Sequence, residues 1–149
     1  MSEPTAAQRD ETARAVSAVM SAADRAAQLL GIEPGAICDG QAVMTMVVRP
    51  DMANSQGNCH GGILFSLADT AFGHACNGSD DTTVIAQAST EFIRPAPLGA
   101  RLTARAVRVH QGRLLGTYDV EIRDDQGQLI ALMRGRSCRV GGRVTGPAG

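Results

Sequence analysis

The amino-acid sequence predicts an α+β fold in which an antiparallel sheet wraps around one long central helix, with a further helix preceding it at the N-terminus. Apolar residues between 59 and 77 recur at helical spacing and small residues fill most of the remaining helix surface, which is typical of a buried helix. The pattern then becomes extended. Four candidate strands follow at residues 82–93, 101–110, 114–123 and 128–140.

The N-terminal segment, residues 5–30, is rich in alanine and carries its apolar residues on one helical face. We expect one helix there, ending at Gly31 and followed by a turn at Pro34-Gly35. Residues 41–49 are rich in Val and Met and are expected to form a strand.

The later strands are separated by turn-forming segments, so we expect consecutive strands to pair as hairpins. Asp125-Gln126-Gly127 is the clearest of these turns, because glycine can adopt a positive φ angle. The predicted organisation is an N-terminal helical extension (1–34), a main domain (35–142) and a flexible tail (143–149).

Composition excludes several classes of function. Of 149 residues, 44% are hydrophobic and 19% are charged, as in a globular domain, and the net charge of -1 gives no attraction to nucleic acid or an anionic membrane. The N-terminus lacks the apolar core of a signal peptide, and no stretch of about 18 apolar residues could cross a membrane. The four cysteines form no Cys-x-x-Cys pair, so we expect a cytoplasmic protein with free thiols.

Asp69 is the residue that local packing does not explain, since it lies among apolar residues on a helix predicted to be buried. Burial of an unpaired carboxylate costs several kcal/mol in practice. Asp69 therefore either lies on a solvated edge, forms an ion pair with an arginine from a strand, or is a working carboxylate exposed to a cleft.

The start of the same helix carries Cys59-His60-Gly61-Gly62. A helix N-terminus presents unpaired N–H groups and the positive end of the helix dipole. The Gly61 N–H could therefore donate to an acyl oxyanion, although the glycines could equally form only a tight turn into the helix.

Gly61 and Asp69 are separated by about 12 Å along a helix that rises about 1.5 Å per residue. A single helix does not easily direct both at one carbonyl carbon. Two antiparallel helices related by a two-fold axis could do so, which predicts at least a dimer if the two residues act together.

Two other arrangements of these side chains are weaker. Cys59 and His60 could form a nucleophile pair, but adjacent residues at a helix start usually point apart. His60, Asp69 and His74 lack the i, i+4 spacing of a helical metal site. We expect His74 and His110 to be ordinary packed or surface histidines.

The chain resembles the PaaI family of hotdog-fold thioesterases over roughly residues 36–146. The most specific feature of this resemblance is His-Gly-Gly followed at the right distance by Leu-Ala-Asp. The matching residues are Asn54, Cys59-His60-Gly61-Gly62, Phe65-Ser66-Leu67-Ala68-Asp69-Thr70-Ala71-Phe72, Ala75-Cys76-Asn77, Phe92-Ile93-Arg94-Pro95, His110-Gln111-Gly112, Tyr118-Asp119-Val120-Glu121-Ile122, Gly135-Arg136-Ser137 and Val140-Gly141-Gly142.

The resemblance implies a hotdog fold that assembles as a homo-oligomer, a dimer of dimers, and hydrolyses small aryl-acyl-CoA such as phenylacetyl-CoA or hydroxyphenylacetyl-CoA. It implies that Asp69 is the nucleophile or general base, that Gly61 donates its N–H to the thioester carbonyl, and that Asn54 and His60 complete the site. It implies no metal and no organic cofactor. Arginines near residues 110–113 are candidates for the CoA phosphates, or else form a solvated face.

Two rival functions remain open at this stage. A non-catalytic acyl-CoA-binding hotdog module would not require Asp69. A hotdog enoyl-CoA hydratase would pair a histidine with a carboxylate in a different motif, which the sequence does not contain.

Overall fold

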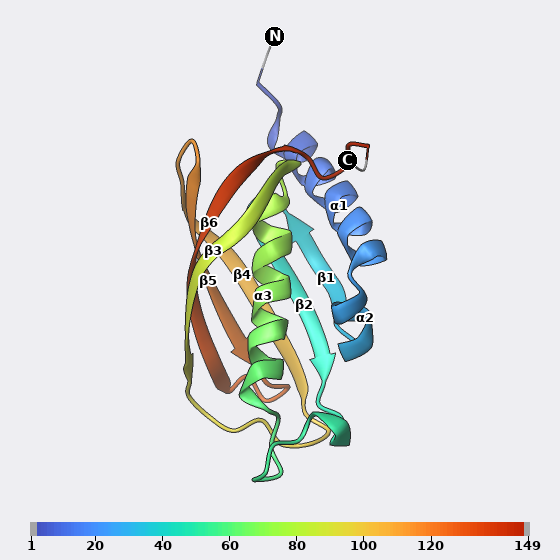
Figure 1. Cartoon of the computed structure of the whole chain (residues 1–149), viewed down its shortest axis with the longest axis vertical. Helices are drawn as coiled ribbons and strands as arrows, with labels where there is room; N and C mark the ends of the chain where they lie inside the picture. The colour runs from blue at the N-terminus through green and yellow to red at the C-terminus, as the bar shows by residue number, and fades with distance from the viewer. Residues whose placement is uncertain (1–2, 148–149) are drawn as a thin grey trace.

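A computed structural model of the chain describes residues 3–147 and contains a six-stranded antiparallel sheet that curls around α3 (Figure 1). The sheet order is β1-β2-β4-β5-β6-β3. The strands are β1 (Glu33–Cys38), β2 (Gln41–Val47), β3 (Asp81–Phe92), β4 (Arg101–Gln111), β5 (Leu115–Arg123) and β6 (Leu129–Arg143). The helices are α1 (Ala6–Ala23), α2 (Arg25–Leu30), the short 3₁₀ helix η1 (Pro50–Met52) and α3 (Gly61–Asn77). The α+β hotdog architecture with a preceding N-terminal helix is confirmed.

The core lies between α3 and the inner face of the sheet. Alternate residues of the strands point inward, as the period of two requires, and Phe72 of α3 is fully buried with its ring centroid 5.1 Å from that of Tyr118. Gly135 is required where β6 crosses α3, because a Cβ atom at this position would overlap the Phe72 ring. The helix therefore packs directly against the sheet.

The N-terminal segment forms two helices, not the one predicted. The chain leaves helical geometry at Asp24 (φ −79°, ψ 91°), whose side chain accepts a hydrogen bond from the Ala27 N–H at 2.9 Å and so caps the start of α2. The predicted end of the helix at Gly31 is confirmed, since Gly31 adopts the left-handed conformation with φ 67°. α1 packs against β1 and α3 (Figure 1).

β1 replaces the turn that was predicted at Pro34-Gly35. The strand pairs antiparallel with β2 and has a register shift between Pro34 and Ile37. Because β1 is at the edge of the sheet, the missing N–H of proline costs no hydrogen bond to a further strand.

The expectation that all later strands form consecutive hairpins is wrong for β3. β4, β5 and β6 do pair in order, and Gly127 (φ 77°) lies in the turn between β5 and β6. β3 instead pairs with β6, for example Glu91 with Leu132. Residues 93–100 are too long for a tight turn and cross to β4 at the end of the molecule, where the Cys59 N–H donates to the Ala96 carbonyl at 2.8 Å.

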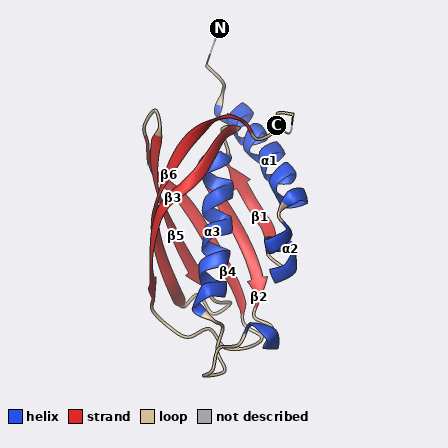
Figure 2. Cartoon of the chain, in the orientation of Figure 1, coloured by secondary structure: helices blue, strands red, loops and turns tan. Residues whose placement is uncertain are grey.

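Figure 2 shows the consequence of this crossing: the loop after β2 and the loop after β3 meet at the N-terminal end of α3. The tail, residues 143–149, was expected to be flexible. Its first residues are bound to Asp80, whose carboxylate accepts hydrogen bonds from the Arg143 side chain at 2.7 Å and the Thr145 N–H at 2.9 Å. Residues 148–149 of that tail lie outside the described range. Within residues 3–147, no helix has the length and apolar character needed to traverse a bilayer.

Candidate active site

His60 is the N-cap of α3. Its Nδ1 atom accepts a hydrogen bond from the Gly62 N–H at 3.0 Å, and its carbonyl accepts from the N–H groups of Ile63 and Leu64. Gly61 lies between His60 and Gly62, and its N–H donates to no acceptor among the described residues. The first residue of the helix therefore keeps a free donor at the positive end of the helix dipole.

Asn54 lies in the loop that leads to this helix end. Its Oδ1 atom accepts from the N–H groups of Gln56 at 2.9 Å and Asn58 at 3.1 Å, which shapes the loop. Its side-chain NH₂ group donates to none of the described residues and remains available as a donor.

A cavity of about 390 Å³ joins these groups at the N-terminal end of α3. Asn54 and Gly61 line it together with Phe92 and Arg94. A Cβ atom at Gly61 would lie 3.3 Å from the Phe92 ring, so glycine keeps the approach to this N–H open. The Arg94 guanidinium donates to the Leu129 carbonyl at 3.0 Å and forms no ion pair with the described residues.

Asp69 lies two turns further along α3, and its carboxylate is half-buried. It forms no ion pair and no hydrogen bond with any residue in the range 3–147. The interpretation of Asp69 as part of an Arg–Asp pair is therefore wrong. Burial raises the pKa of the Asp69 carboxyl, and the negative charge of Asp24 raises it further.

Asp69 faces a second cavity, of about 400 Å³. Met20 and Asp24 from the N-terminal helices, Gly73 and His74 from α3, and the start of β3 line this cavity. It shares no lining residue with the cavity at Gly61. Within one chain the structure brings Asn54, His60 and Gly61 together but leaves Asp69 apart from them, as the helical spacing predicts.

The sequence did not indicate that Met20 and Asp24 line the cavity at Asp69. Asp24 carried a usable signal, because an Asp inside an Ala-rich helical pattern is a typical N-cap of a new helix. No local signal places Met20 beside α3, since the two segments are far apart in the sequence.

The nucleophile pair of Cys59 and His60 does not form. The Cys59 thiol is directed at the His60 carbonyl at 3.7 Å, while the His60 ring is engaged by Gly62. Burial raises the pKa of the Cys59 thiol to about 11, so the thiol is protonated at neutral pH. All four cysteines are free thiols.

The remaining histidines occupy the ordinary positions that were predicted for them. His74 is buried, and its Nδ1 atom lies 2.8 Å from the Ser17 Oγ atom of α1, while His110 is exposed. Within residues 3–147, no group of three or more His, Cys, Asp or Glu side chains is arranged to hold a metal ion.

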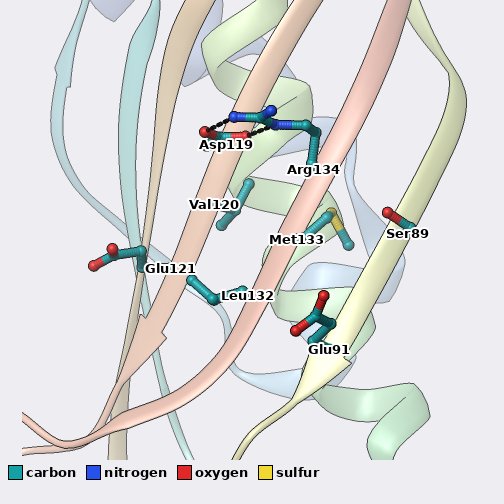
Figure 3. Close-up of a pocket in the computed structure, with 8 residues that line it drawn as sticks. All are labelled: Ser89, Glu91, Asp119, Val120, Glu121, Leu132, Met133 and Arg134. Atoms are coloured by element: carbon teal, nitrogen blue, oxygen red, sulfur yellow. Dashed lines mark hydrogen bonds and ion pairs between the residues drawn. The ribbon is translucent and has the colours of Figure 1, made fainter.

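A third cavity, of about 400 Å³, lies over β3, β5 and β6 (Figure 3). Its arginine, Arg134, is held by Asp119 through two hydrogen bonds of 2.6 Å. Glu91 and Glu121 also line it. With its only arginine paired and two further carboxylates present, this cavity does not suit an anionic CoA.

Comparison with known proteins places the chain among thioesterases. The family model of the thioesterase superfamily matches residues 56–131. The chain is 46% identical to the acyl-coenzyme A thioesterase PaaI of Escherichia coli (strain K12) over 125 residues, which cover 84% of this chain and 89% of that protein.

Similar solved structures also include thioesterases. The E. coli PaaI protein from the phenylacetic acid degradation operon has a TM-score of 0.89 at 42% identity, covering 90% of this chain and 97% of that chain. A hypothetical thioesterase protein from Streptococcus pneumoniae TIGR4, solved with coenzyme A, has a TM-score of 0.72 at 30% identity, covering 75% of this chain and 88% of that chain.

Proposed function

The chain belongs to the thioesterase superfamily as a PaaI-type acyl-CoA thioesterase, and from this premise we propose that it hydrolyses small aryl-acyl-CoA such as phenylacetyl-CoA or hydroxyphenylacetyl-CoA. Water adds to the thioester carbonyl, the carbon–sulfur bond breaks, and the products are the free aryl acid and CoA. The reaction needs no metal or organic cofactor.

The observation that carries this proposal is the carboxylate of Asp69, which lines an open cavity and has no partner within residues 3–147. A half-buried carboxylate without a counter-ion is costly to the fold, which is typical of a residue retained for chemistry. Burial that raises its pKa also makes the ionised carboxylate a stronger base. Asp69 either attacks the carbonyl carbon directly or removes a proton from the attacking water.

The negative charge that develops on the carbonyl oxygen needs a donor, and Gly61 of the partner subunit supplies it in our proposal. The free Gly61 N–H and the Asp69 carboxylate face separate cavities of one chain. An antiparallel pair of α3 helices would bring one of each to a shared thioester. The homodimer would thus form two complete sites, and we propose a dimer of dimers as the full assembly.

β3 offers the edge through which two subunits would meet. It is the last strand of the sheet, so one side of its backbone has no neighbouring strand within residues 3–147. Val84 and Phe92 are exposed along it, and these two residues line the Asp69 cavity and the Gly61 cavity respectively. Pairing of β3 with its copy would draw both cavities to one interface.

Asn54 and His60 have supporting roles. The free NH₂ group of Asn54 would orient the attacking water or the Asp69 carboxylate of the partner subunit. His60 would hold the helix start so that the Gly61 N–H keeps its direction. The CoA part of the bound substrate would extend out of the site past Arg94, which lines the Gly61 cavity.

We also propose that the enzyme is cytoplasmic.

An aryl-acyl group is supported by the size and lining of the Asp69 cavity. A dry cavity of about 150 Å³ is enough to bind benzene in a protein core. The cavity of about 400 Å³ beside Asp69 is open and has a mixed lining, in which Met20, Val84 and Ile85 supply the apolar side chains that an aryl ring would contact. The relative from the phenylacetic acid degradation operon supports the same substrate class.

The test is a thiol-release assay with phenylacetyl-CoA on the purified protein. We expect Asp69→Asn to lower kcat by about 100-fold or more, the usual contribution of a general base. A variant that retains most of the wild-type turnover would contradict the mechanism. Ser66→Ala is the matched control, because Ser66 is also on α3 but donates only to the Gly62 carbonyl at 2.9 Å.

Two further assays separate the rival functions. Wild-type protein that binds acyl-CoA without releasing thiol would be a binding module. Hydration of crotonyl-CoA without thiol release would indicate a hydratase. A panel of acyl-CoAs then ranks phenylacetyl against aliphatic substrates, and a preference for aliphatic chains would refute the aryl-acyl assignment.

A further inference from the structure

The N-terminal helix α1 reaches over α3 at the position one turn beyond Asp69. Gly73 is four residues after Asp69 and therefore lies on the same face of α3. Glycine leaves space beside the helix there. The single atom within 4 Å of a Cβ atom built at Gly73, apart from its neighbours in the helix, is the terminal methyl carbon of Met20 at 3.8 Å.

A buried hydrogen bond holds α1 in this position. Ser17 is one turn before Met20, and its Oγ atom lies 2.8 Å from Nδ1 of His74, the residue next to Gly73. Ser17 and His74 are 4% and 3% exposed, so this contact is sealed from solvent. This side-chain contact holds α1 against α3, while the Met20 side chain remains half-buried and lines the cavity.

The part of the cavity beside Gly73 suits an apolar group, while Asp24, Thr70 and Asn77 make other parts of its lining polar. Met20 and Gly73 form one wall, and Val84 and Ile85 of β3 form another. Methionine is unbranched and flexible, so it conforms to the group that it contacts. An acyl chain whose carbonyl carbon is at Asp69 and which extends along α3 meets the Met20 methyl group after one helical turn, about 5.4 Å.

We propose that Met20 is a specificity-determining residue, whose side chain over Gly73 closes the far end of the acyl pocket and limits the length of the acyl group. The inference rests on the proposed function, because it takes the Asp69 cavity as the acyl pocket. It assigns to the N-terminal extension a role in choosing the substrate.

The experiment compares kcat/KM for acetyl-CoA, phenylacetyl-CoA and 4-phenylbutanoyl-CoA. Met20→Ala should raise the ratio of phenylbutanoyl to phenylacetyl turnover by about tenfold, since one methylene in a hydrophobic pocket is commonly worth about 10-fold or more. Met20→Phe should lower the ratio of phenylacetyl to acetyl turnover by a similar factor. Val19→Ala is the matched control, since Val19 is 44% exposed on α1 and does not line the cavity.

A second variant narrows the pocket from α3, beside the Met20 methyl group, and keeps the test informative if Met20→Ala is unstable. Gly73→Ala adds a methyl group at ordinary van der Waals distance from Met20, and alanine favours the helix. It should lower the ratio of phenylacetyl to acetyl turnover. The double variant Met20→Ala/Gly73→Ala should recover that ratio, because the two residues share one space.

The failures of the two proposals are distinguishable. Wild-type protein without thioesterase activity, or active Asp69→Asn, would refute the proposed function and with it this inference. Active wild type, inactive Asp69→Asn, and Met20 and Gly73 variants whose ratios all stay within twofold of wild type would overturn the role of Met20 alone.

Discussion

Asp69 and Asp24 place two carboxylates around one cavity, and no cation from residues 3–147 pairs with either. A nearby negative charge disfavours the ionised form of a carboxyl group. Burial is the larger cause of the raised pKa of Asp69, and the charge of Asp24 is the second. His74 borders the same cavity, but burial lowers its pKa, so it supplies no compensating positive charge at neutral pH.

Asp24→Asn isolates the charge of Asp24 from its structural role, because asparagine caps a helix about as well as aspartate. In the proposed mechanism activity requires ionised Asp69, so it should be lost as the pH falls through the pKa of this carboxyl. Removing the negative charge of Asp24 lowers the pKa of Asp69, so the acidic limb of the kcat/KM profile should move to lower pH.

The pH profile of phenylacetyl-CoA hydrolysis measures this shift. Glu11→Gln removes an exposed carboxylate from α1 outside the cavity and serves as the control. An Asp24→Asn profile that overlays the wild-type profile would show that Asp24 acts only as a helix cap.

At the scale of the elements, the packing of α3 against β6 determines where the candidate site residues lie. Phe72 packs against the strand at Gly135, where a side chain would overlap its ring and approach the Gln87 carbonyl to 2.9 Å. Neither the backbone of β3 nor the fully buried ring has room to move away. The absence of a side chain at Gly135 therefore sets the distance between helix and sheet.

Gly135→Ala should destabilise the protein by about 1–3 kcal/mol, the usual cost of overpacking a core. Urea denaturation at equilibrium measures the free energy of unfolding. Gly127→Ala is the control: it adds a Cβ atom in the turn between β5 and β6, where no atom lies within 4 Å, and so reports the cost of the positive φ angle alone. A Gly135 variant as stable as wild type would mean that α3 shifts freely on the sheet.

At the scale of the whole molecule, the proposed site is complete only when two chains meet. Gly61→Pro is a suitable probe, because proline removes the N–H, its ring occupies the space beside Phe92, and it is favoured at the first position of a helix. The extended backbone of His60 (φ −60°, ψ 136°) is compatible with a following proline.

Asp69→Asn and Gly61→Pro should each be inactive alone but regain activity when co-expressed. A mixed dimer pairs Asp69 of one chain with Gly61 of the other and restores one site of its two, so random mixing should recover about one quarter of wild-type turnover. Thiol release by the co-purified mixture, against each variant alone, measures the recovery. No gain on mixing would mean that each site lies within a single chain.

Much of this fold was predictable because its signals are local. The buried helix at 59–77 corresponds to α3 (Gly61–Asn77), since nearly every helical position there is apolar or small. β1 was missed because a short edge strand with Pro34 and Gly35 has the composition of a turn. The pairing of β3 with β6 was missed because local patterns do not encode which strands become neighbours.

The candidate site likewise has a part that local sequence predicts and a part that only the packing of distant segments creates. Asn54, His60 and Gly61 lie close together in the sequence, so their meeting at one helix end follows from the helix start that their residue types indicate. Met20 and Asp24 reach Asp69 only through the packing of α1 on α3.

The sequence by itself determined the thioesterase family, the buried helix, and the separation of Gly61 from Asp69 along it, since each depends on residue types at short spacings. The tertiary structure decided that no cation pairs with Asp69 within residues 3–147, and that the Met20 methyl group lies beside Gly73. These outcomes depend on which distant segments come into contact when the chain folds, and the free energy of that packing is a property of the whole molecule.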